Sequence, residues 1–195
     1  HLMVAVVPDK ARIYPQRLAA GAYPDYLAAR YGDALGALRT RGVDVVDLLA
    51  PLQRGAAGAQ VYYSSDTHWN QNGARIAAEA IARAVQERRL TLAPTTFSTS
   101  SGAAAERPGD LIRLMGLEHA PAWLRPPADL EAPAVTRQTS VDAQGGLFDS
   151  VAVPVVLTGT SFSMRGNFHG YLQQALSAKV LNTAKDGGGF LQAAE

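Results

Sequence analysis

The side chains in this sequence that could do chemistry together are a carboxylate, an imidazole and a hydroxyl, carried by two short motifs. Asp66 and His68 lie two residues apart in the motif Asp-Thr-His-Trp, and Ser161 lies in the motif Gly-Thr-Ser-Phe-Ser. A hydroxyl is a poor nucleophile unless a base removes its proton, and the base works best when a third group holds it. The residue types therefore favour nucleophilic acyl chemistry, and we expect each of the three residues at the end of a strand.

The hydroxyl of Ser161 follows an apolar run, residues 151–158, which we expect to be the central strand of a parallel sheet. Open α/β sheets bind their ligands at the carboxyl ends of their strands. A helix directly after Ser161 would also direct backbone N–H groups to this point, which suits a developing oxyanion. The alternative is that Ser161 and Ser163 only cap the helix. The motif by itself leaves both interpretations open.

The spacing of Asp66 and His68 predicts a hydrogen-bonded pair. In an extended or turn conformation, residues two positions apart project to the same side. Asp66 can then hold one ring nitrogen of His68 while the other nitrogen faces the serine. One alternative is a polar loop in which Asp66 caps local backbone and His68 is incidental. A metal site is not expected, because it needs three or four ligands and the sequence shows no further cluster at ligand spacing.

The other histidines compete for the role of base. His1 lies at the end of the chain, and His119 lies in a segment of irregular composition. His169 follows Ser161 by about two helical turns, so it could contact substrate but is too far away for a direct hydrogen bond. These positions leave His68 as the predicted base.

The composition sets limits on the class of protein. A chain of 195 residues with 47% hydrophobic residues can form one domain, and its net charge of +1 without a basic stretch gives no reason to expect nucleic acid as a partner. The absence of cysteine excludes thiol catalysis, disulfides and cysteine-based zinc sites. The chain opens inside an expected strand, residues 2–7, and closes near a glycine-rich turn, residues 187–189. We therefore expect a fragment whose targeting segment lies outside it.

Apolar runs and amphipathic stretches alternate along the chain, which is typical of an α/β fold with a mainly parallel central sheet. The segment 91–146 is rich in Ala, Pro, Ser and Thr, and we expect an irregular surface insertion with one short helix at about 110–117. The insertion belongs to a single predicted domain, residues 1–195. The other expected strands cover residues 2–7, 43–48 and 179–182, and the expected helices cover residues 23–41, a stretch capped by Asn70 or Asn72, and residues 168–176.

Four segments together resemble the AlgX/AlgJ family of alginate O-acetyltransferases. They are residues 8–15, 45–48, 66–74 and 159–163, which occur in the order expected for that family and extend over nearly the whole chain. The resemblance implies a three-layer SGNH-hydrolase-like domain. It also implies a circularly permuted order of motifs, since the Asp-x-His pair precedes the serine.

The same resemblance implies roles for individual residues. Ser161 would be the nucleophile, His68 the base and Asp66 the residue that orients it. Arg165 and Asn167 lie where the family has polar residues near the site, and would contact substrate or an oxyanion. Helix capping is the alternative for Asn167. Apart from the resemblance, Trp69, with Tyr62, Tyr63 and Trp123, could offer a platform for a sugar ring, although core packing is the default expectation for each.

The function implied is transfer of acetyl groups onto an exopolysaccharide such as alginate, in the periplasm and without a cofactor. A membrane-bound O-acyltransferase partner would deliver the acetyl group, and a segment outside this chain could tether the domain to the inner membrane. Two alternatives stay open: a carbohydrate acetylesterase with the same triad, and a non-catalytic polysaccharide-binding module. The triad does not separate transferase from esterase, because acceptor binding and water exclusion decide between them.

Overall fold

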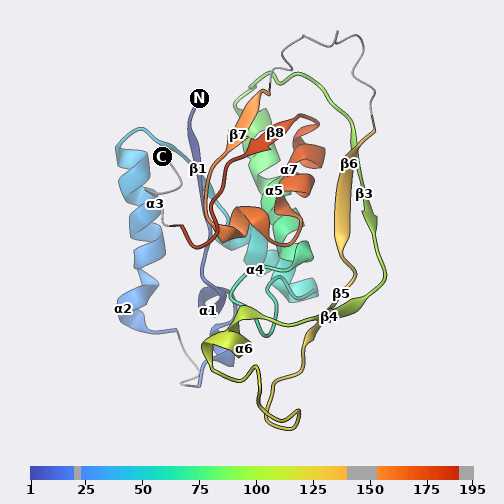
Figure 1. Ribbon diagram of the computed structural model, residues 1–195. Coiled ribbons are helices and arrows are strands. Elements are labelled where there is room, and N and C mark those ends of the chain that lie inside the picture. Colours follow the sequence, from blue (N-terminus) through green and yellow to red (C-terminus); the bar gives the residue numbers. More distant parts are fainter. Residues whose placement is uncertain (20–22, 140–152, 189–195) are drawn as a thin grey trace.

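The computed structural model describes residues 1–19, 23–139 and 153–188. Helices and short parallel strands alternate at both ends of the chain, and the middle contributes antiparallel strands (Figure 1). The α/β class predicted from the sequence is confirmed. The helices are α1 (Lys10–Ile13), α2 (Asp25–Ala28), α3 (Arg30–Thr40), α4 (Leu49–Gly58), α5 (Gln71–Glu87), α6 (Asp110–Leu114) and α7 (Phe168–Leu176), with 3₁₀ helices η1 (Pro15–Arg17) and η2 (Ser161–Met164). The strands are β1 (Met3–Val6), β2 (Asp44–Asp47), β3 (Phe97–Ser101), β4 (Ala105–Arg107), β5 (Asp129–Glu131), β6 (Ala134–Gln138), β7 (Val155–Leu157) and β8 (Val180–Asn182).

Two parallel strand pairs lie at the centre of the fold. β1 pairs with β2 and β7 pairs with β8, and all four correspond to predicted apolar runs. Each strand is shorter than its run, and the described residues contain no ladder that joins the two pairs into one sheet. Pro154 helps to explain the late start of β7, because proline has no N–H to give to a ladder. Residues 151–152, the start of the predicted strand, and Gly189 lie outside the described residues.

Helices cover both sides of these strands. Figure 1 shows α3 on one side of the strands, with α5 and α7 on the other. The buried core includes residues from α4, α5 and α7 together with residues of β2 and β8. This arrangement agrees with the three layers that the sequence analysis expects.

The helix predicted over residues 23–41 is divided into α2 and α3. Arg12 donates hydrogen bonds to the carbonyl groups of Leu27 and Ala28, each at 2.7 Å, and so holds the end of α2. Gly42 ends α3 as predicted, with φ of +74° and its N–H bonded to a carbonyl of the last turn. Glycine suits this position because the left-handed conformation costs it little.

The longest helix, α5, starts at a side-chain cap. The side chain of Asn70 accepts a hydrogen bond from the N–H of Gly73 at 3.0 Å, which is one of the two caps considered from the sequence. α5 packs on α7 through small residues, and Ala74, Ala77 and Ala78 are fully buried. Gly73 allows the first turn of α5 to approach the chain closely, because a Cβ there would lie 2.1 Å from the carbonyl oxygen of Val61.

The segment 91–146 is more regular than the sequence analysis expects. Its described residues contain four strands and helix α6, with β3 antiparallel to β6 and β4 antiparallel to β5. β3 and β6 contact α7, and the segment passes along one side of the molecule and beneath it (Figure 1). The helix predicted at 110–117 is confirmed in shorter form, as α6.

Among the described residues, no helix has the length and apolar composition needed to cross a membrane.

The close approach of α5 to Val61 gives a testable consequence. Gly73→Ala should lower the free energy of unfolding by about 1–3 kcal/mol, because the added methyl group overlaps a backbone oxygen that cannot move freely. Gly36→Ala in α3 is the matched control, since a Cβ there meets nothing within 4 Å. That control should leave stability unchanged or raise it by up to about 1 kcal/mol. Urea unfolding of both variants tests this, and equal stabilities would contradict it.

Candidate active site

Asp66 and His68 lie in the loop between α4 and α5, and Ser161 begins η2 after β7. The loop is a hairpin closed by an isolated bridge between Tyr62 and Trp69. The sequence prediction that all three residues lie at strand ends is therefore correct for Ser161 and wrong for the other two. The hairpin still places the acid and the base side by side, because its backbone reverses within a few residues.

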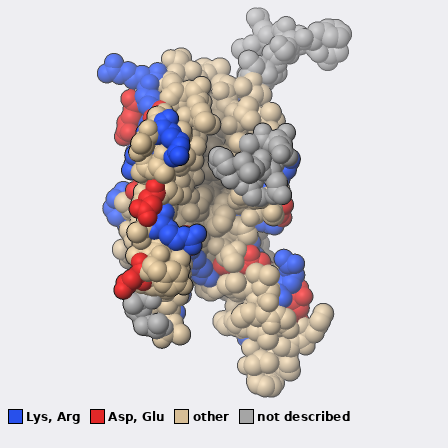
Figure 2. Space-filling model, turned by 90° about the vertical axis from the view of Figure 1, so that its left-hand side faces the viewer, with Lys and Arg blue, Asp and Glu red and all other residues tan. Residues whose placement is uncertain are grey.

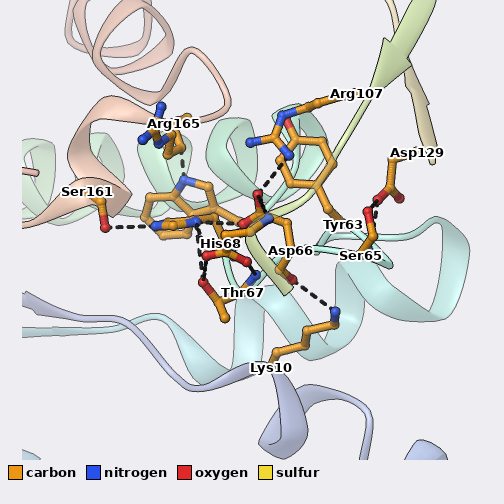
Figure 3. A network of polar contacts seen from close by, with 12 residues as sticks. Lys10, Tyr63, Ser65, Asp66, Thr67, His68, Arg107, Asp129, Ser161 and Arg165 are labelled. Carbon is orange, nitrogen blue, oxygen red and sulfur yellow. Dashed lines mark hydrogen bonds and ion pairs between the residues drawn. The ribbon is translucent and has the colours of Figure 1, made fainter. Parts of the chain in front are cut away.

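The structure brings the predicted triad into one hydrogen-bonded line (Figure 3). His68 Nδ1 lies 2.6 Å from Asp66 Oδ1, and His68 Nε2 lies 2.7 Å from Ser161 Oγ. Asp66 and His68 are buried, at 3% and 8% exposure, whereas Ser161 is partly exposed. With Nδ1–H donating to the carboxylate, Nε2 is free to accept the proton of the Ser161 hydroxyl. The arrangement can therefore withdraw a proton from a serine that a ligand can reach.

The Asp66 carboxylate receives donors at both of its oxygen atoms. Oδ1 accepts from the backbone N–H of His68 at 2.8 Å as well as from Nδ1, and Oδ2 accepts from Arg107 at 2.9 Å and from the N–H of Asp110 at 3.3 Å. Burial alone would raise the pKa of Asp66, but the hydrogen bonds from His68 and Arg107 outweigh it and hold that pKa well below its usual range. Asp66 is therefore ionised wherever His68 can act as a base.

Arg107 was not found by the sequence analysis. It is the last residue of β4, and its guanidinium lies 3.8 Å from the centre of the Tyr63 ring and 3.7 Å from a carboxylate oxygen of Glu131. The Tyr63 hydroxyl donates to the same carboxylate of Glu131. Arg107 is thus held from several sides in a position where it balances the charge of Asp66.

Two further carboxylates of the insertion hold the hairpin. Asp129 accepts the backbone N–H groups of Ser64 and Ser65 at 2.7 and 3.0 Å, and these bonds lower its pKa although burial opposes them. Asp110 accepts the N–H of Thr67 at 2.8 Å. Gly109 makes this close packing possible, because a Cβ there would lie 1.8 Å from the carbonyl oxygen of Ser65.

Lys10 supports the hairpin from the amino-terminal part of the chain. Its Nζ donates to the carbonyl oxygen of Ser64 at 2.9 Å. It also donates to the carbonyl oxygen of Asp66 at 3.0 Å (Figure 3). Burial lowers the pKa of Lys10, and the carboxylates of Asp129, Asp66 and Asp110 partly oppose this. Lys10 belongs to the segment 8–15 that the sequence analysis singled out for its resemblance, although no role was assigned to it.

Asp66, His68 and Asp110 each offer one side-chain atom, and these atoms lie within 4.8 Å of one another, which is close enough to share a cation. Asp110, the second carboxylate of this group, was not predicted from the sequence, because α6 brings it from a distant part of the chain. The atoms in this group already exchange hydrogen bonds with each other, with Thr67 and with Arg107. What the geometry supports is therefore proton transfer through His68.

The turn that carries Ser161 differs from the prediction. A short 3₁₀ helix, η2, begins at the serine itself, whereas α7 begins only at Phe168. The N–H of Ser163 bonds to the carbonyl of Thr160 at 2.9 Å. The backbone N–H groups of Ser161 and Phe162 stand at the start of η2, where a helix offers no internal acceptor.

Aromatic packing joins this turn to the hairpin. The Phe162 ring lies 4.8 Å from the ring of His68 and 5.1 Å from that of Trp69, measured between ring centres. Trp69 also packs against Phe168 at 5.0 Å and is 1% exposed. The expectation that Trp69 offers a platform for a sugar is therefore wrong, since neither face of its ring is free.

The other three aromatic residues that were considered as platforms for a sugar differ in their burial. Tyr62 and Tyr63 are buried, at 0% and 3% exposure, and they serve the core and the hairpin. Trp123 is 83% exposed and lies beyond α6, so its ring is open to a ligand.

Arg165 and Asn167 are engaged with other elements. The Arg165 guanidinium lies 2.8 Å from Asp186 at the surface, and the Arg165 carbonyl accepts from Trp69 Nε1 at 3.4 Å. The backbone of Asn167 is in the left-handed conformation, with φ of +56°, and its side chain donates to Thr136 of β6 at 2.9 Å. It precedes α7 without capping it through its side chain, so the capping alternative is wrong. In this structure neither side chain makes a polar contact with Ser161 or His68.

His169, the alternative base, has a different partner. Its Nε2 lies 2.7 Å from the carbonyl oxygen of Val180, so it joins α7 to β8. His1 pairs with Asp44 at 2.6 Å, and His119 is exposed. Of the four histidines, His68 is the one that the structure places against Ser161.

Comparisons with known proteins agree with this geometry. The model of the SGNH hydrolase-like domain of acetyltransferase AlgX matches residues 1–195. Relatives named probable alginate O-acetylase AlgJ are 36% identical in Pseudomonas putida and 35% identical in Pseudomonas aeruginosa, covering 97% and 98% of this chain but 51% and 52% of those proteins. The chain thus spans about half the length of the curated relatives it matches.

Solved structures show the same relationship. The O-acetyltransferase domain of Pseudomonas putida AlgJ superimposes with a TM-score of 0.85 and 36% identity, over 97% of this chain and 64% of that one. Pseudomonas aeruginosa AlgX gives a TM-score of 0.72 and 26% identity, over 97% of this chain and 46% of that one. On the match to the family model and these likenesses, the chain belongs to the AlgX family of SGNH hydrolase-like acetyltransferase domains.

Proposed function

We propose that this domain transfers acetyl groups through an acetyl-serine intermediate onto hydroxyl groups of an exopolysaccharide such as alginate. The observation that carries the proposal is the unbroken line of hydrogen bonds from Asp66 through His68 to the partly exposed Ser161. The names of the relatives, probable alginate O-acetylases, support the choice of acetyl transfer and of polysaccharide.

In the first half of the reaction, Ser161 attacks the carbonyl carbon of an acetyl donor. His68 Nε2 takes the proton from Oγ as the new carbon–oxygen bond forms. The N–H groups at the start of η2 are placed to stabilise the oxyanion. The tetrahedral intermediate then releases the donor's leaving group, which takes the proton from His68. The product of this half is acetyl-Ser161.

In the second half, a sugar hydroxyl attacks the acetyl group on Ser161. His68 removes the proton of that hydroxyl and returns it to Ser161 Oγ when the acetyl ester on the serine breaks. The ionised Asp66 stabilises the imidazolium that forms in both halves. Attack by water in place of the sugar would release acetate, which is the reaction of an esterase.

The partners and the compartment are also part of this proposal. We place the domain in the periplasm, with its acetyl groups supplied by a membrane-bound O-acyltransferase partner and a polysaccharide as acceptor. Figure 2 shows basic and acidic side chains mixed on one face of the molecule, without a continuous basic area in its described part. This distribution does not favour nucleic acid as a partner.

Removal of the triad side chains tests the proposal directly. Ser161→Ala and His68→Ala should each lower the turnover of a chromogenic acetyl ester by ~10³-fold or more, because each removes a member of the unit that forms acetyl-Ser161. His169→Gln is the matched control, since its amide can still donate to the Val180 carbonyl. That variant should keep nearly full activity.

The product distinguishes the functions. Mass spectrometry of the parent reaction with an oligomannuronate acceptor should show acetyl groups on the sugar. Free acetate alone would indicate an esterase. A folded parent with no more turnover than its triad variants would indicate a binding module and contradict the proposal.

Arg107 should matter for stability as well as for activity. Arg107→Met leaves the buried Asp66 carboxylate without its cationic partner and should lower the free energy of unfolding at pH 7 by about 2–4 kcal/mol. Arg165→Met, which removes an exposed pair with Asp186, should cost at most about 1 kcal/mol. Urea unfolding measures both, and equal costs would contradict the assigned difference.

The pH dependence of stability follows from the lowered pKa of Asp66. A carboxylate with a lowered pKa in the folded state stabilises that state above its unfolded pKa of about 4, and the contribution is lost as the pH falls toward the folded value. The parent should therefore lose stability steeply below about pH 4. Arg107→Met should show a shallower decline over the same range, measured by urea unfolding at a series of pH values. A decline as steep as the parent's would show that Arg107 does not set the ionisation of Asp66.

A further inference from the structure

The imidazole of His68 faces two carboxylates at the same ring nitrogen. Asp66 Oδ1 lies 2.6 Å from Nδ1, and Asp110 Oδ2 lies 3.6 Å from it. The first distance is a hydrogen bond, whereas the second is an ionic contact whenever the ring is protonated. The Asp66 side chain is 5% exposed and that of Asp110 is 23% exposed, so neither charge is fully screened by water.

Asp110 is held in this position by both its backbone and its side chain. It is the first residue of α6, and its N–H donates to Asp66 Oδ2 at 3.3 Å. Its carboxylate accepts the backbone N–H of Thr67 at 2.8 Å and also the hydroxyl of Thr67. A carboxylate oxygen has two lone pairs, so Oδ2 can accept from Thr67 and still take a second donor.

The carboxylates around His68 differ in whether a basic side chain balances their charge. Asp66 is paired with Arg107, which cancels much of its charge as seen from the ring. Lys10 binds carbonyl oxygens of the hairpin, and Asp129 and Glu131 of β5 are bound to the hairpin backbone and to Tyr63 and Arg107. On the side of η2, the ring meets Phe162, which is uncharged. Asp110 is therefore the carboxylate near the ring that no arginine neutralises in the described structure.

We propose that Asp110 is a second positioning carboxylate for His68, which stabilises the imidazolium together with Asp66 and partly replaces Asp66 when that residue is changed. The catalytic part of this inference rests on the proposed function. The electrostatic part does not, because the protonation of His68 can be measured without any substrate.

Asp110→Asn is the decisive variant, since it keeps the size of the side chain and one of its two acceptor oxygens but removes its charge. In NMR titrations of ¹⁵N-labelled protein, the His68 ring of this variant should lose its proton more readily than that of the parent. The direction follows because the protonated ring loses a negative neighbour. Asp110→Glu should restore the parent titration. The samples contain a chelator, because Asp66, His68 and Asp110 lie close enough to share a cation.

Thr67→Val separates charge from structure. It removes the hydroxyl that ties Asp110 to the hairpin and that also lies 3.4 Å from His68 Nδ1, but it keeps the carboxylate and the backbone hydrogen bond of Thr67. If Asp110 acts through its charge, Asp110→Asn should change the titration of His68 more than Thr67→Val does. If Asp110 only holds the hairpin, Thr67→Val and Asp110→Asn should have the same effect, and the inference would be overturned.

Kinetics test the replacement of Asp66. Asp110→Asn should lower kcat about 3- to 10-fold with little change in KM, and Asp66→Asn should keep at least ten times the activity of the double variant Asp66→Asn/Asp110→Asn. Additive effects with an unchanged titration would overturn the inference. If Asp110→Asn shifts the titration of His68 but the parent transfers no acetyl group, Asp110 remains the second carboxylate and the proposed function is refuted.

Discussion

The burial of the Asp66 carboxylate is the constraint on which the rest of the site depends. A charge at 3% exposure is tolerable only when its oxygen atoms receive hydrogen bonds and an opposite charge lies nearby. The donors come from three parts of the chain: His68 in the same hairpin, Arg107 at the end of β4, and the backbone N–H of Asp110 at the start of α6. The hairpin and the segment that contains β4 and α6 must therefore fold together. The segment that contains β4 and α6 is a structural part of the site, although its sequence gives little sign of that.

The nucleophile is positioned by a different force. Phe162, next to Ser161, lies against both His68 and Trp69, and Trp69 packs in turn on Phe168 of α7. α5 begins two residues after Trp69, with Asn70 as its cap, so the helix that forms much of the core also fixes the end of the hairpin. The distance of 2.7 Å between Ser161 and His68 is thus set by aromatic packing as well as by their own hydrogen bond.

The sequence predicted those features that depend on local patterns. The short spacing of Asp66 and His68, the end of α3 at Gly42 and the extent of α7 follow from turn geometry, glycine conformation and helical periodicity. The strands β3 and β6 were missed, because β3 is rich in Ser and Thr, neither strand is long enough to show a clear apolar alternation, and the two pair across a long separation in the chain. Arg107 and Asp110 were missed for the same reason, since only the folded insertion brings them to the hairpin. The burial of Trp69 also depends on rings from distant segments, which local pattern does not reveal.

The hairpin that carries His68 and the turn that carries Ser161 respond differently to pH. Phe162 also packs on Tyr62 and Trp69, whose rings carry no group that ionises between pH 3 and 8, so this part of the support for Ser161 is insensitive to pH in that range. The place of His68 depends on carboxylates at Asp66, Asp110 and Asp129, which all bind the hairpin as acceptors and lose their charge and part of their acceptor capacity on protonation. Acid should therefore loosen the hairpin more than the turn of Ser161, because protonation weakens these acceptors and leaves the contacts of Phe162 with Tyr62 and Trp69 intact. Charged hydrogen bonds hold the hairpin that carries Asp66 and His68, and aromatic packing holds the turn that carries Ser161. The two parts meet at the imidazole ring of His68.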